Sequence, residues 1–215
     1  MKMKNLIFLL LLFPCTLHAQ FGIKAGINFA NVTNASSISN GNRSGFMAGI
    51  FLAPPSKGIL SYKTELIFSQ QGYDYNTNSN TGSVTLNYII MPHLMNINIT
   101  KLFQLQIGGQ VAYLLNAKAD SNKTASSTNP YGALEDYYNR FDYGAAAGFE
   151  IHPVLGLLIG ARYNISFGDM YKNISNPTQG ATPPFIPNVN LKNNVVQVFA
   201  GWRFGKNDKK KKKQK

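Results

Sequence analysis

The side chains able to do acid–base or nucleophilic chemistry are few in this sequence and widely spaced. His18 lies near the start, and neither His93 nor His152 has a serine or carboxylate at a spacing typical of a catalytic triad. The close acidic pair Glu135 and Asp136 lies in a polar stretch, whereas a metal site needs clustered His, Cys or carboxylate ligands. We therefore predict a non-enzymatic protein without a cofactor or metal site.

A second group of side chains is chemically more interesting, because charges stand among apolar residues at alternate positions. Such charges must pair with one another if they are buried, or they line a polar path if they are not. Which of the two holds depends on the elements that position them. The residues in question are Lys24, Lys63, Glu65, Asp142, Glu150, Arg162 and Arg203.

The elements expected to carry these charges are β-strands. Apolar residues alternate with Gly, Gln, Asn and charged residues in eight segments, and strict alternation is typical of a half-buried strand. No stretch shows a convincing 3.6-residue period, so we predict no long helix. The expected strands are residues 21–29, 45–52, 60–69, 84–96, 102–116, 141–150, 157–167 and 195–204.

The connections between these strands alternate in length. Long polar connections are expected after the first, third, fifth and seventh strands, at residues 31–44, 70–83, 117–140 and 168–194. The intervening connections, such as residues 53–59, are short. Long loops on one side and tight turns on the other are typical of a transmembrane barrel with both termini in the periplasm. We predict an all-β fold: an eight-stranded antiparallel transmembrane β-barrel, an up-and-down meander with long extracellular loops and short periplasmic turns.

The two faces of each strand agree with a membrane location. Only a closed barrel lets strands span lipid with every backbone donor paired, and aromatic residues are expected at both membrane interfaces. In the fourth strand we place Leu86, Tyr88 and Ile90 on the lipid face. A soluble periplasmic lipocalin-like barrel that binds a small apolar ligand stays open as the alternative, because alternation alone does not say which face points out. The predicted interface aromatics are Tyr62, Tyr88, Tyr113, Tyr163, Trp202 and Phe204.

In a membrane barrel of eight strands, the seven charged residues point into a lumen that is only wide enough for side chains to fill. We favour a salt-bridged plug that locks the barrel. A narrow polar conduit or a small-ligand site is the alternative. The spacing does not say which pairs form.

The composition excludes several other classes. Charged residues make up 14% of the 215 residues, against about 25% in typical soluble domains. The net charge of +12 is uneven: residues 205–215 contribute +6, and residues 20–204 contribute +4. A nucleic-acid-binding protein needs a basic cluster on a folded face, so we predict no nucleic-acid partner. The Lys-rich tail, residues 205–215, is predicted to be disordered and periplasmic, where an envelope protein could contact it.

The first nineteen residues have the order of a secretory signal peptide. Two lysines precede an unbroken apolar run over residues 6–13, and Ala19 offers a small residue for cleavage before Gln20. A lipoprotein signal at Cys15, the single cysteine, is the alternative, but Pro14 stands where such a signal needs a small residue. We therefore predict residues 1–19 as a signal peptide, residues 20–204 as the barrel, and export to the outer membrane.

Several short motifs resemble the PorT-like outer-membrane β-barrel proteins of Bacteroidota-type bacteria. Together they span residues 20–204. The resemblance implies insertion by the barrel-insertion machinery, which reads a C-terminal aromatic strand, and a structural, adhesion-type or accessory role in an envelope complex that in some members concerns secretion. The motifs are FGIKAGIN at residues 21–28, KTEL at 63–66, SQQG at 69–72, NYIIMP at 87–92, FDYG at 141–144, GFE at 148–150, RYN at 162–164 and GWRF at 201–204.

Overall fold

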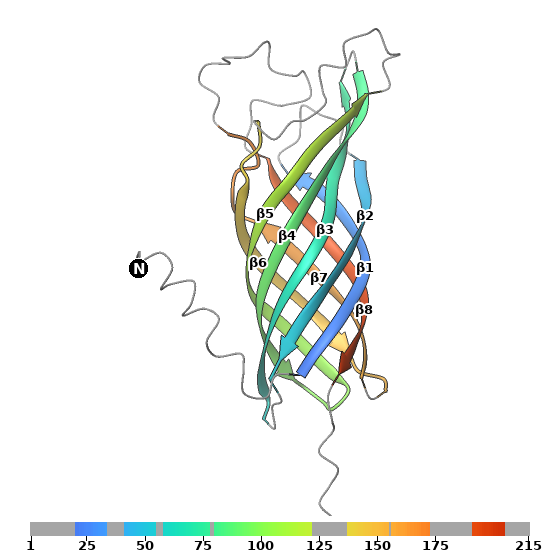
Figure 1. The fold of residues 1–215 in the computed structure, drawn as a ribbon, viewed down its shortest axis with the longest axis vertical. Helices are drawn as coiled ribbons and strands as arrows, with labels where there is room; N and C mark the ends of the chain where they lie inside the picture. The colour runs from blue at the N-terminus through green and yellow to red at the C-terminus, as the bar shows by residue number, and fades with distance from the viewer. Residues whose placement is uncertain are drawn as a thin grey trace, which may run out of the picture.

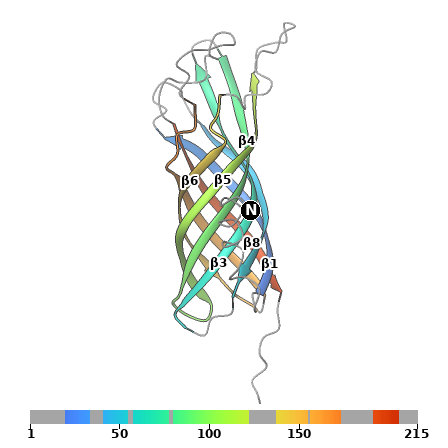
Figure 2. The same ribbon diagram turned by 60° about the vertical axis from the view of Figure 1, so that its left-hand side comes forward.

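The described part of the chain is one antiparallel sheet of eight strands that closes into a barrel (Figures 1 and 2). The computed structural model describes residues 20–33, 41–54, 58–77, 80–121, 137–154, 156–172 and 191–204. Neighbouring strands pair in chain order, and β1 also pairs with β8, which closes the sheet. The strands are β1 (Gln20–Thr33), β2 (Gly41–Ala53), β3 (Leu60–Thr77), β4 (Asn80–Asn98), β5 (Phe103–Ser121), β6 (Phe141–Ile151), β7 (Leu157–Ser166) and β8 (Lys192–Phe204).

The two ends of the barrel differ. We call the end where β1 begins and β8 finishes the turn end, since Phe21 pairs with Phe204 there, and the opposite end the loop end. The connections at the turn end are short (Figure 1). The predicted signal peptide, the Lys-rich tail and most of the longer loop-end connections lie outside the described residues.

One expected loop is instead part of the sheet. Residues 70–83 were expected to form a long connection, but β3 and β4 continue pairing from Gln70 with Asn87 up to Thr77 with Asn80. The sequence there alternates Gln71, Tyr73 and Tyr75 with more polar residues, and all three of these side chains are buried. Antiparallel pairing satisfies the backbone of this polar stretch, so it extends the sheet rather than leaving it.

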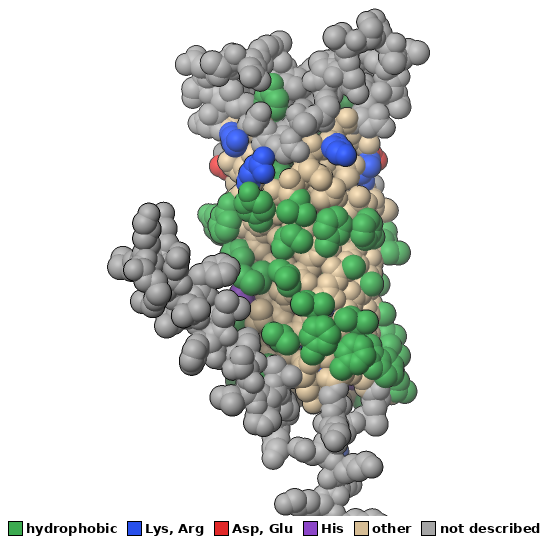
Figure 3. Space-filling view, viewed as in Figure 1, with side chains coloured by type: hydrophobic (Ala, Val, Ile, Leu, Met, Phe, Trp, Pro, Cys, Tyr) green, Lys and Arg blue, Asp and Glu red, His purple; other side chains and the backbone are tan. Residues whose placement is uncertain are grey.

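Apolar side chains cover the outer surface. Alternate residues of the strands, such as Ile23, Ile50, Ile107 and Val198, are exposed, although each belongs to an aliphatic type that is normally buried in a soluble domain. Figure 3 shows hydrophobic side chains spread over the visible middle of the barrel, with basic side chains above them towards the loop end. This apolar band is the surface that a transmembrane barrel presents to lipid.

The predicted facing of β4 is wrong. Leu86, Tyr88 and Ile90 were placed on the lipid face, but all three are buried inside the barrel, with Tyr88 only 4% exposed. The register decides the matter: Ile90 lies opposite the buried Ile67 of β3, and a β-bulge on the β5 side shifts the pairing between Asn87 and Tyr88. A shift of one residue moves every side chain of a strand to the other face.

The interior has two layers. Towards the loop end, an apolar cluster that includes Val84, Leu86, Leu114 and Tyr138 fills the lumen. Towards the turn end, a smaller cluster that includes Phe51 and Phe199 packs beside buried charged residues. No helix in the described part of the chain has the length and apolar character needed to cross a bilayer.

Candidate functional site

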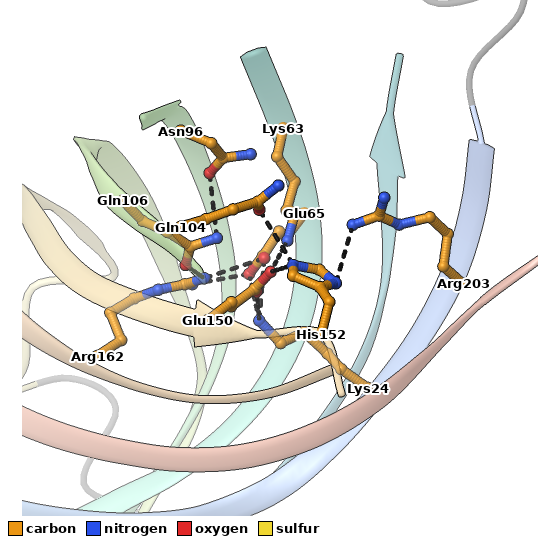
Figure 4. Close-up of polar contacts among 10 residues, drawn as sticks. All are labelled: Lys24, Lys63, Glu65, Asn96, Gln104, Gln106, Glu150, His152, Arg162 and Arg203. Atoms are coloured by element: carbon orange, nitrogen blue, oxygen red, sulfur yellow. Dashed lines mark hydrogen bonds and ion pairs between the residues drawn. The ribbon is translucent and has the colours of Figure 1, made fainter. Parts of the chain in front are cut away.

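Five of the seven predicted lumen charges come together near the turn end (Figure 4). β1 supplies Lys24, β3 supplies Lys63 and Glu65, β6 supplies Glu150 and β7 supplies Arg162. Each lies at an inward position of its strand, and each side chain is fully buried. We call these five residues the charge lock.

Glu65 is the centre of the charge lock. Its carboxylate accepts two hydrogen bonds from the Arg162 guanidinium, at 2.7 and 3.0 Å, and two from the Lys24 ammonium, at 2.9 and 3.1 Å. Arg162 also donates to the Gln106 side-chain oxygen at 2.9 Å, and Gln106 donates to Asn96 at 3.1 Å. The paired geometry of a guanidinium with a carboxylate is the strongest arrangement available to such side chains.

Glu150 is the second anion of the charge lock. It accepts a hydrogen bond from Lys63, and its other oxygen lies 3.8 Å from the Lys24 ammonium. The five residues thus combine three cations with two carboxylates, so one positive charge is in excess.

Two buried phenylalanine rings offset part of this excess. The Lys24 ammonium lies 3.5 Å from the centroid of the Phe199 ring, and Arg162 approaches the same ring at 5.3 Å. Lys63 lies 4.9 Å from the centroid of Phe51. The negative face of an aromatic ring attracts a cation, and more strongly when water is excluded. Sequence reasoning missed both rings, although each occupies a position on the polar side of its strand.

The other two predicted residues lie apart from the charge lock. Asp142, at the loop-end start of β6, accepts hydrogen bonds from the Ser166 hydroxyl and from the backbone of Tyr143 and Gly168. Arg203, near the end of β8, lies beside His152, with Nη2 at 3.5 Å from Nδ1 of the imidazole. The seven predicted residues therefore occupy three places in the lumen.

His152 connects Arg203 to the barrel wall and was not predicted to have a role. Its Nε2 lies 3.1 Å from the Gln104 side-chain oxygen. One tautomer satisfies both contacts: Nε2–H donates to Gln104, and the lone pair of Nδ1 accepts from Arg203. Burial, together with the Arg203 charge, lowers the pKa of His152 to about 4, so the ring is neutral at pH 7.

Tyrosines close the loop end of the lumen. The Tyr73 hydroxyl contacts the hydroxyls of Tyr138 and Tyr171, the first at 3.0 Å. An isolated β-bridge joins the backbones of Tyr138 and Tyr171, and the Met170 N–H donates a hydrogen bond to the Leu191 carbonyl. Burial raises the pKa values of Tyr138 and Tyr171 above the usual value for tyrosine, so both hydroxyls stay neutral. We call Tyr73, Tyr138 and Tyr171 the tyrosine cap.

The predicted interface aromatics divide into two sets. Tyr88 is buried in the lumen, as the register of β4 requires, and is no interface residue. The structure places the other five, Tyr62, Tyr113, Tyr163, Trp202 and Phe204, on the outer surface with exposed side chains.

The histidines and carboxylates outside the charge lock are the remaining candidates for metal-site or triad geometry. The described residues contain no group of three His, Cys, Asp or Glu side chains close enough to hold a metal ion. On the outer surface, His93 Nδ1 lies 2.8 Å from the Tyr62 hydroxyl and 3.2 Å from the Thr64 hydroxyl. Among the described residues no carboxylate contacts His93, so a triad is not assembled around this ring.

Comparison with known proteins places this geometry in a family. Two solved structures are similar over nearly their whole length: Ail, the attachment invasion locus protein of Yersinia pestis, in complex with the heparin analogue sucrose octasulfate, and Neisserial surface protein A. Ail is 14% identical, with 87% of this chain and 100% of that chain covered and a TM-score of 0.50. The Neisserial protein is 14% identical, with 86% and 97% covered and a TM-score of 0.49.

These identities show a shared fold at most. Comparison with curated protein sequences gave no significant match. The family described as the outer membrane protein beta-barrel domain matches residues 14–172, which is more than half of the chain. The closed barrel, its apolar outer band and this match agree: the chain belongs to the outer membrane protein beta-barrel domain family and is an integral protein of the outer membrane.

Proposed function

We propose that this protein is a non-enzymatic barrel with a sealed lumen, acting as a structural or adhesion-type membrane protein or as an accessory subunit of an envelope complex. The observation that carries the proposal is the filling of the lumen at two levels. The charge lock occupies the turn-end half, and the tyrosine cap with its apolar cluster occupies the loop-end half.

A small cavity lies between these two levels. This polar cavity, beside Gln110, Asp142 and Asn164, has a volume of about 10 Å³, close to what a single water molecule needs. Several buried amide groups around it, including both polar atoms of Asn164, have no protein partner in the described part of the chain. One water molecule would satisfy some of these atoms. A hydrated ion passing through the lumen would have to displace both the charge lock and the tyrosine cap.

The proposal extends to features that lie outside the described residues. Residues 1–19 would direct export, and the Lys-rich tail would extend into the periplasm, where a partner protein of the envelope could bind it. The aromatic end of β8, with Trp202 and Phe204 on the lipid face, would be read by the barrel-insertion machinery. We also propose that the chain is a PorT-like member of its family, on the motifs given above.

Conductance across a planar lipid bilayer tests the sealed lumen. We expect no stepwise ion conductance from the purified wild-type protein. The double variant Glu65→Ala with Arg162→Ala removes the centre of the charge lock, and Tyr73→Phe with Tyr138→Phe removes hydroxyls from the tyrosine cap. Neither double variant by itself should conduct steadily, because the first leaves the tyrosine cap closed and the second leaves the charge lock closed. Steady conductance by the wild-type protein, comparable to that of an open pore, would overturn the proposal.

A further inference from the structure

The mouth of the barrel at the turn end forms an open vestibule of about 660 Å³. This volume falls within the range of small-ligand sites, about 300–1,000 Å³. The vestibule lies between the β4–β5 and β6–β7 connections and the end of β8. Its lining includes Lys101, Gln104, His152, Trp202 and Arg203.

The charge of this lining is positive. Among the described residues that line it, Lys101 and Arg203 are the cations, and none is Asp or Glu. His152 adds no positive charge, because burial and Arg203 keep its ring neutral. Lys101 also lines the adjoining hollow of about 540 Å³ beside Gly58 and Asn98, so it borders both hollows.

Arg203 lacks a carboxylate partner among the described residues. The interior carboxylates Glu65 and Glu150 are already held by Lys24, Lys63 and Arg162. The Nε of Arg203 is buried and has no hydrogen-bond partner in the described part of the chain. Counting Arg203 with the charge lock, four cations face two carboxylates. One of the two excess charges belongs to the charge lock, and the other, on Arg203, lies at the vestibule.

The position of Arg203 suits anion binding. His152 accepts a hydrogen bond from Nη2 and fixes the guanidinium at the mouth, as Figure 4 shows. A fixed guanidinium presents a planar set of donors that matches phosphate oxygens in pairs. The neutral His152 acts as a positioning residue in this arrangement, and the exposed Lys101 supplies a second charge.

The vestibule also borders the membrane. Leu102, Val154, Trp202 and Phe204 line it and are exposed at the turn end of the outer surface. The phosphate groups of phospholipid headgroups lie at this depth, beside lipid-facing aromatic residues. We propose that the turn-end vestibule binds a phosphate group, mainly through Arg203 and with the help of Lys101. A phospholipid headgroup and free phosphate both carry this group.

The single tryptophan of the chain, Trp202, lines the vestibule and reports on binding. The full chain, purified from membranes in a nonionic detergent, is titrated at constant ionic strength while Trp202 fluorescence is followed. The probes are dihexanoyl phosphatidylglycerol, inorganic phosphate, dihexanoylglycerol as the uncharged lipid, and acetate as a different oxyanion. The variants are Arg203→Gln and Lys101→Gln, with Lys118→Gln, an exposed lysine towards the loop end, as the matched control.

We expect saturable binding of phosphatidylglycerol that Arg203→Gln weakens at least tenfold and Lys101→Gln weakens several-fold, with Lys118→Gln equal to wild type. Phosphate binding within tenfold of phosphatidylglycerol would identify free phosphate as sufficient. Much weaker phosphate binding would identify the lipid headgroup. Equal binding in Arg203→Gln, or acetate or dihexanoylglycerol binding as tightly as phosphatidylglycerol, would overturn the proposal. If Arg203→Gln does not fold, the proposal is still tested by the weaker binding expected for Lys101→Gln and by the comparison of the four probes.

Discussion

Neutralising Glu65 should destabilise the barrel more than any surface charge change. Its carboxylate accepts four hydrogen bonds from Arg162 and Lys24 at 2.7–3.1 Å, without contact with water. At about 3 Å and an effective dielectric constant of about 20, each charge pair gains roughly 5 kcal/mol before the cost of desolvation. Glu65→Gln leaves two cations uncompensated, and breaking a buried pair in this way costs about 3–5 kcal/mol.

Urea unfolding of the protein in lipid vesicles, followed by Trp202 fluorescence and by heat-modifiable gel mobility, measures this loss. Asp74→Asn is the matched control, because the exposed Arg43–Asp74 pair, at 3.1 Å, should contribute only about 0.2–1 kcal/mol. The triple variant Lys24→Met, Glu65→Leu, Arg162→Met removes the charges together and should lose much less than Glu65→Gln. A Glu65→Gln variant within about 1 kcal/mol of Asp74→Asn would refute the reasoning.

Three further predictions concern the lipid face, a turn and the vestibule. Val198→Arg places a charge on the exposed middle of β8 and should lower the free energy of unfolding by about 2–4 kcal/mol in vesicles; an unchanged value would contradict the orientation of β8. Gly156→Ala should lower it by about 1–2 kcal/mol, because φ is +91° there and a Cβ would lie 2.9 Å from Trp202; urea unfolding checks this, with Gly58→Ala, which has open space around it, as the control. His152 has a pKa of about 4 in the folded state, below the usual 6.5, so only the unfolded chain binds a proton between these values. Stability should therefore fall as the pH is lowered from about 6.5 to about 4, and His152→Gln should show a smaller fall in the same titration.

The sequence predicted which charged residues face the lumen. It did not predict which of them come together in one cluster. The inward positions of Lys24, Lys63, Glu65, Glu150 and Arg162 follow from alternation along their own strands. Their separation from Asp142 and Arg203 depends on height along the barrel axis, which the stagger between strands sets. The contacts of Phe199 and Phe51 with the cations were not predicted. An aromatic residue on the polar face of a strand does not indicate a cation contact until the tertiary structure places a cation beside it.

The sequence by itself determined the number of strands, their order and, for most of them, the side chains that share a face. The reason is that the period of two is a local property of an extended chain. The tertiary structure alone decided which face of β4 points inward, because both of its faces are apolar near Tyr88 and the register with β3 chooses between them. It also decided that Glu65 meets Arg162, a partner 97 residues away, because only closure of β8 onto β1 brings β7 across the lumen from β3.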